Sequence, residues 1–194
     1  MLKWFLVWAD LILFMHCVLF ADSAFALNKN ELREINNRVN ALVILLSDNS
    51  ADEYQEAREI AELDLDNDGH KLITALFSIE GFNGGNGHVQ YLAVFVDRYE
   101  GISTRPTRLT LLDFTPVGSK GWRSLCCFSS IRLVQNEVEI NFDTKEYGTD
   151  DPSCCPSVAS HAVYRMKIDE ITGRLREITA QLSDAPHGAS ECCR

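Results

Sequence analysis

A change in the spacing of apolar residues divides this chain and limits what it can fold into. Up to about residue 62, apolar residues recur every three or four positions, as on one face of an α-helix. From Lys71 onward they mostly alternate with polar residues, as in a β-strand. The segment His88–Val96 is apolar on both faces, which predicts a central strand covered on both sides. We therefore expect helices first and a sheet after them.

Two helices are predicted before the sheet. Asn28 and Glu31 have the spacing of a capping box, and the apolar residues that follow form one helical stripe: Leu32, Ile35, Val39, Leu42, Val43 and Leu46. Ser50 and Glu53 form a second capping box, which predicts a shorter helix with the stripe Tyr54, Ala57, Ile60 and Ala61. We expect both helices to pack on the sheet.

Six to seven strands are predicted after Lys71. The first carries Ile73, Ala75, Phe77 and Ile79 on one face, the second is 88–96, and the others are 107–115, 122–134, 137–144, 160–168 and 174–181. Short links with turn-forming residues indicate an antiparallel meander. In 137–144 the polar residues alternate with Val138, Ile140 and Phe142, so this strand is expected to show one face to water. Helices that precede the strands indicate the α+β class.

The first 26 residues have the layout of a secretory signal peptide. Lys3 precedes an apolar run, and Ala24-Phe25-Ala26 is a cleavage pattern, so we expect cleavage at about Ala26 and a periplasmic or secreted protein. An uncleaved anchor is the alternative. The remainder, 27–194, is expected to be one domain with a helical head (27–62), a sheet (71–182) and a cysteine-containing tail (183–194).

The net charge of the chain excludes two classes of binding partner. The formal net charge is −10, whereas a nucleic-acid-binding surface needs a basic excess. The same charge argues against binding to an anionic membrane surface once the signal is cleaved. We therefore expect neither nucleic acid nor a membrane as partner.

Six cysteines follow the signal segment as three adjacent pairs: Cys126 and Cys127, Cys154 and Cys155, Cys192 and Cys193. Export to an oxidising compartment favours disulfides. Zinc is less favoured, because zinc sites usually separate their sulfurs by two to four residues. We expect bridges between the pairs to staple strand 122–134, loop 148–157 and the tail to one another, in a connectivity that the sequence leaves open.

The acidic run 64–69 places Asp64, Asp66 and Asp68 at alternate positions before a glycine, as calcium loops do. With the His70 carbonyl they form a candidate set of calcium ligands. The run departs from an EF-hand because Ala75 stands where a bidentate Glu belongs, so any calcium is expected to bind weakly. A solvated acidic turn is the equal alternative.

The stretch 147–157 combines two prolines with a cysteine pair, which predicts a rigid loop. Rigidity lowers the entropic cost of recognition, so Tyr147, Asp150, Asp151 and Pro152 are candidate recognition residues. Trp122, in the basic turn 118–123, is a further candidate recognition residue. The alternatives are a pinned connection between strands for the loop and a packing anchor for Trp122.

The spaced carboxylates at 64–69, the antiparallel strands and the run Asp150-Asp151-Pro152-Ser153-Cys154-Cys155-Pro156-Ser157 together resemble LppP/LprE-type lipoproteins, which are small exported bacterial proteins. The resemblance covers roughly residues 62–170 and rests on two short motifs. It implies location and architecture but no reaction. The chain departs from these lipoproteins because Cys17 follows His16, where a lipid-attachment site has a small residue.

No complete catalytic motif is found in the sequence, neither G-x-S-x-G nor H-E-x-x-H. The leading prediction is therefore a non-enzymatic binding or interaction protein of the cell envelope, whose partner is another envelope protein or a toxin. A sharper alternative is an inhibitor or immunity protein that acts on a toxin or a hydrolase. A second alternative is a metal-dependent hydrolase that uses Asp64, Asp66 and Asp68.

Overall fold

The computed structural model describes residues 27–65, 71–98, 108–152, 155–167 and 173–178. The predicted signal segment lies outside these residues, and so does the whole of the predicted tail. Outside them too are Asp66, Asp68 and His70 of the acidic run and three of the six cysteines of the doublets, Cys154, Cys192 and Cys193.

The first predicted helix is confirmed as α2 (Lys29–Leu46). The Asn28 carboxamide oxygen accepts the amides of Asn30 and Glu31 at 3.0 and 3.1 Å, and Glu31 accepts the Asn28 amide at 2.9 Å. These bonds satisfy backbone donors that a helix start leaves without partners. The helix ends where both the amide and the hydroxyl of Ser47 donate to the Val43 carbonyl.

The second predicted helix is wrong. Its segment forms β1 (Asp52–Glu53), the 3₁₀ turn η1 (Gln55–Ala57) and β2 (Glu59–Asp64), and both strands pair antiparallel with β3 (Lys71–Glu80). The reason is the free edge of β3. Without β1 and β2, the backbone groups along that edge would lack hydrogen-bond partners, which outweighs a moderate local preference for helix.

The remaining strands form the predicted antiparallel meander: β4 (His88–Arg98), β5 (Arg108–Ser119), β6 (Arg123–Val134), β7 (Glu137–Glu146), β8 (Val158–Lys167) and β9 (Arg176–Ile178). A second 3₁₀ turn, η2 (Phe82–Gly84), lies between β3 and β4. The order is β1-β3-β4-β5-β6-β7-β8-β9, with β2 also on β3. The predicted α+β class is therefore wrong: within the described residues the protein is mainly antiparallel sheet, with nine strands and a single α-helix.

The sheet folds over between β5 and β6, which share one register pair, Ser119 with Arg123. The side chain of Gln90 on β4 bridges this seam. Its amide donates to the Leu125 carbonyl at 3.0 Å and accepts the Leu125 amide at 2.7 Å, as a neighbouring strand would. Gly118 leaves room for this side chain, because a Cβ there would lie 2.6 Å from the Gln90 oxygen.

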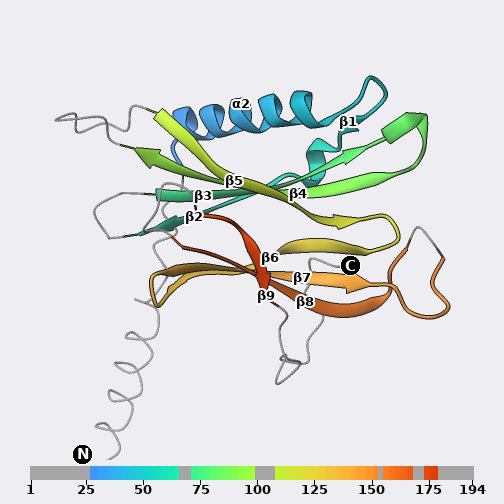
Figure 1. Ribbon diagram of the computed structural model, residues 1–194. Helices are drawn as coiled ribbons and strands as arrows, with labels where there is room; N and C mark the ends of the chain where they lie inside the picture. The colour runs from blue at the N-terminus through green and yellow to red at the C-terminus, as the bar shows by residue number, and fades with distance from the viewer. Residues whose placement is uncertain (1–26, 66–70, 99–107, 153–154, 168–172, 179–194) are drawn as a thin grey trace, which may run out of the picture.

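Folding over at the seam produces three layers: α2, then β2–β5, then β6–β9 (Figure 1). One hydrophobic cluster lies between α2 and the outer face of β3 and β4, and includes Ile35, Val39, Phe77 and Phe95. The other lies between the two sheet layers and includes Leu76, Leu92, Ile140, Phe142 and Met166. The predicted double cover of the strand at 88–96 is thus confirmed, since Leu92–Phe95 are all buried.

The predicted disulfide staple is not found within the described residues. The three described cysteines, Cys126, Cys127 and Cys155, are disulfide-bonded, but no bridge joins two of them. Cys126 lies at an irregularity in the β6–β7 register, between Leu125 and Cys127.

Candidate functional site

Four loops meet at one end of the sheet, which we call the loop end: residues 47–51, 81–87, 118–122 and the described parts of 147–157 (Figure 1). Hydrogen bonds connect each loop to the next. Asp48 accepts the Asn83 amide at 2.9 Å, Lys120 donates to Asn86, and the Gly121 amide donates to the Tyr147 hydroxyl at 3.1 Å. The loop end is therefore one connected surface.

Asp48 organises the first two of these loops. Its carboxylate accepts the amides of Ser50, Ala51 and Asn83 and the Ser50 hydroxyl, at 2.7–2.9 Å. These bonds, the Asn83 amide first, lower the pKa of Asp48 from 3.8 to about 2. Gly81, in the glycine-rich link between β3 and β4, has φ +88°, a conformation that glycine adopts without strain. The Asp48 carboxylate therefore stays charged in moderate acid and continues to hold loops 47–51 and 81–87 together.

Trp122 is the most prominent side chain of the loop end. It is 47% exposed, and the guanidinium of Arg123 lies 4.2 Å from its ring centroid. Such a contact between a cation and a ring face is attractive and restrains the ring. Trp122 is therefore a half-exposed aromatic ring that the guanidinium of Arg123 supports on one face.

Arg123 is itself buried and held on several sides. It donates to the Val117 carbonyl at 2.8 Å, to both carboxylate oxygens of Glu177 at 2.6 and 2.8 Å, and to the Tyr164 hydroxyl. Burial acts to lower the pKa of Arg123, but the bonds to Glu177 outweigh it and the net direction is upward. The hydrogen bond from Arg123 lowers the pKa of Glu177. The ion pair thus anchors the cation beneath Trp122.

The loop that follows β7 is held by Asp151. Its carboxylate accepts the amides of Gly148 and Ser157 and the Ser157 hydroxyl, each at 2.7 Å. The Gly148 amide is the largest cause of a lowered pKa for Asp151. Asp151 is therefore a structural clamp, while Asp150 and Pro152 beside it are exposed. The structure places all five predicted recognition residues, Trp122 included, at the loop end.

A hollow of about 380 Å³ opens at the same end. Asp52, Glu80 and His88 line it and lie side by side on β1, β3 and β4, since Glu80 is the register partner of both other residues. The loop end therefore carries the exposed carboxylates of Asp52 and Glu80 as well as the aromatic ring of Trp122.

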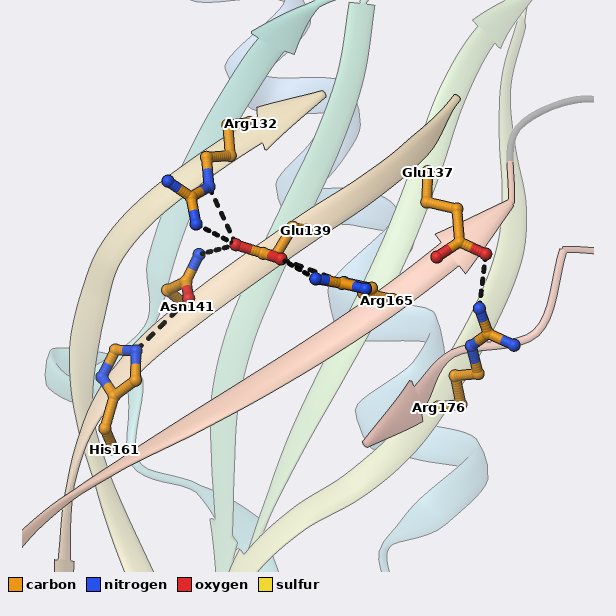
Figure 2. Close-up of polar contacts among 7 residues, drawn as sticks. All are labelled: Arg132, Glu137, Glu139, Asn141, His161, Arg165 and Arg176. Atoms are coloured by element: carbon orange, nitrogen blue, oxygen red, sulfur yellow. Dashed lines mark hydrogen bonds and ion pairs between the residues drawn. The ribbon is translucent and has the colours of Figure 1, made fainter. Parts of the chain in front are cut away.

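The outward face of β7 differs from its prediction. Glu139 and Asn141 were expected to face water, but both are buried, because side chains of the neighbouring strands cover them (Figure 2). Arg132 on β6 and Arg165 on β8 each donate twice to Glu139, to opposite carboxylate oxygens. Glu139 is 5% exposed and Arg132 is 62% exposed, so this face presents cations above a recessed carboxylate.

A second hollow, of about 520 Å³, lies between α2 and the segment 55–60; we call it the helix groove. Its lining residues come from two separate parts of the sequence: Leu32, Asn36, Asn40, Gln55, Arg58 and Ile60. Sequence reasoning missed this groove. The i, i+4 recurrence of Leu32, Asn36 and Asn40 was visible, but the segment opposite them was assigned to a helix.

Of the four candidate calcium ligands the structure describes Asp64 alone, which ends β2 and is the register partner of Lys71 on β3. Among the described residues no group of three or more His, Cys, Asp or Glu side chains is placed to hold a metal ion. The calcium site stays a prediction on residues outside the described ranges.

No protein-family model, curated protein or solved structure matches this chain. Within the described residues, no helix has the length and apolar character needed to cross a membrane.

Proposed function

We propose that this chain is an exported, non-enzymatic interaction protein that recognises a partner protein with its loop end. The observation that carries the proposal is the half-exposed Trp122 held on the buried cation of Arg123. An exposed tryptophan that is fixed in place loses little conformational entropy on binding, and tryptophan is enriched among the residues that dominate interface energies.

The surroundings of Trp122 support the same function. Tyr147 is tied to the turn that carries Trp122, and Asp151 holds the adjacent loop, so the surface is largely formed before a partner arrives. The exposed carboxylates of Asp52, Glu80 and Asp150 lie at the same end of the sheet. A partner that presents basic side chains complements this surface, which favours the inhibitor or immunity protein as the specific form of the function.

Site-specific photocrosslinking tests the proposal. A benzophenone amino acid replaces Trp122 in the protein produced by its own cells, and the matched control replaces Leu133, which is 45% exposed and lies at the opposite end of β6. We expect a discrete adduct of one protein at position 122 and none at 133. Equal adducts at both positions, or an adduct at 133 alone, would contradict recognition by the loop end.

A second variant separates recognition from folding. Asp150→Asn changes an exposed carboxylate that makes no hydrogen bond among the described residues, so stability should be unchanged. If a basic partner binds here, adduct formation at position 122 should fall and should depend on salt concentration. If neither the substitution nor the salt concentration changes adduct formation, the inference that the partner is basic is wrong.

A further inference from the structure

Arg58, which lines the helix groove, forms a buried ion pair with Glu53. Arg58 is 10% exposed and Glu53 is 3% exposed, and the guanidinium donates to both carboxylate oxygens. Glu53 neutralises the charge of Arg58, so the lining of the groove offers little attraction to a charged ligand. A ligand that fits here should therefore be neutral.

Arg58 also fixes the orientation of two amide side chains of α2. It donates to the Asn36 oxygen at 2.7 Å and to the Asn40 oxygen at 2.6 Å. Because a guanidinium group only donates, the oxygen of each amide has to face Arg58 and the NH₂ group has to face away from it. Neither NH₂ group makes a hydrogen bond among the described residues, so the groove presents two oriented donors without acceptors.

The spacing of these donors matches one ligand geometry. Asn36 and Asn40 are four residues apart on a helix, which separates them by about 6 Å along the axis. In an extended peptide the carbonyl groups on one edge recur every second residue, about 6.6 Å apart. Two such carbonyls can accept from the two amides at once. Leu32 and Ile60 supply apolar lining for neutral side chains between the carbonyls.

From this geometry we propose that the helix groove binds an extended, neutral peptide segment, whose alternate carbonyl oxygens accept hydrogen bonds from Asn36 and Asn40. A volume of about 520 Å³ is in the range of ligand-binding pockets. The groove is separate from the loop end in its residues, so this site does not depend on recognition by Trp122.

The experiment uses a library of random seven-residue peptides displayed on phage and selected on the full-length protein. An enriched peptide is synthesised and titrated into the ¹⁵N-labelled protein, and the side-chain NH₂ signals of Asn36 and Asn40 are followed. We expect uncharged sequences and saturable shifts of both signals. Cellobiose, titrated in parallel, is a neutral ligand whose acceptors are hydroxyl groups, and it should leave the signals in place.

Asn40→Asp is the decisive variant. The carboxylate keeps an oxygen for Arg58 but removes the NH₂ donor, so the fold is retained and peptide affinity should fall about tenfold. Asn36→Asp is the second variant, with the same expectation. Asn37→Asp is the matched control, because it makes the same charge change on an exposed part of the same helix that does not line the groove.

Four results would overturn the proposal. The first is the absence of enriched peptides, and the second is enrichment of charged peptides alone. The third is a loss of affinity in Asn37→Asp that equals the loss in Asn40→Asp. Shifts of the two amide signals by cellobiose in place of the peptide would assign the groove to a saccharide and would equally contradict it.

Discussion

Glu139 allows the sharpest test of the energetics of this fold. The change is Glu139→Gln, which keeps the size of the side chain and removes its charge. In the native protein the carboxylate receives two hydrogen bonds from Arg132, two from Arg165 and one from Asn141 (Figure 2). A glutamine keeps one accepting oxygen, and its NH₂ group must then face one of the two guanidinium groups, donor against donor.

The expected cost follows from the exposure of the partners. A hydrogen bond to a charged group contributes about 1.5–3 kcal/mol, and breaking a buried charge pair costs about 3–5 kcal/mol. Arg132 is 62% exposed and Arg165 is 34% exposed, so water replaces part of what either arginine loses. We therefore expect Glu139→Gln to lower the free energy of unfolding by about 2–3 kcal/mol.

The pH dependence gives an independent check on the same residue. Burial acts to raise the pKa of Glu139, but the hydrogen bonds from Arg132 and Arg165 outweigh it, and the pKa lies below its usual value of 4.5. The stabilisation is therefore fully present above pH 4.5 and is lost as the pH falls through the folded-state pKa. The gap between native protein and variant should narrow in that acid range.

Urea unfolding followed by circular dichroism measures both effects, at neutral pH and in acid. The matched control is Glu137→Gln on the same strand, whose carboxylate pairs with Arg176, an arginine that is 56% exposed. This control should cost about 0–1 kcal/mol. Equal costs for the two variants, or a cost of Glu139→Gln that does not change with pH, would refute the role assigned to the buried carboxylate.

Three further outcomes are expected. Asp48→Asn should destabilise the protein above pH 3.8, and the difference in melting temperature from the native protein should disappear as the pH falls through about 2, because the native pKa is lowered to that value. Phe77→Ala should cost about 3–5 kcal/mol in urea unfolding, because Phe77 is fully buried under α2. Gly81→Ala should cost about 1–2 kcal/mol in the same assay, since φ is +88° there and the methyl group would lie 2.9 Å from the Ser50 carbonyl oxygen. A stable Gly81→Ala protein would show that the loop adopts another conformation.

Local signals predicted the elements that depend on nearby residues. The capping box of Asn28 and Glu31 located the start of α2, and the alternation after Lys71 located β3. The segment 52–64 could not be assigned in this way, because its structure depends on the free edge of β3, which only the assembled sheet reveals. A helical pattern of weakly apolar residues does not outweigh a row of backbone groups that need partners.

The same limit explains what was missed at the sites. Burial of Glu139 depends on Arg132 and Arg165 from two neighbouring strands, and only the register brings them together. The helix groove likewise needs Arg58 to meet Asn36 across 22 residues of sequence. The sequence could predict part of the grouping of Trp122 with Tyr147, because each residue lies in or beside a turn at the end of a predicted strand.

The burial of β3 on both of its faces determines how the protein unfolds. Eight successive residues of this strand, Leu72–Ile79, are buried. Ile73, Ala75, Phe77 and Ile79 belong to the cluster under α2, and Leu72 and Leu76 belong to the cluster between the sheet layers. Neither cluster can be exposed by peeling away β3 without exposing the other. The two halves therefore unfold as one cooperative unit, and the amide protons of β3 exchange with solvent only through global unfolding, at the rate set by the stability of the whole domain.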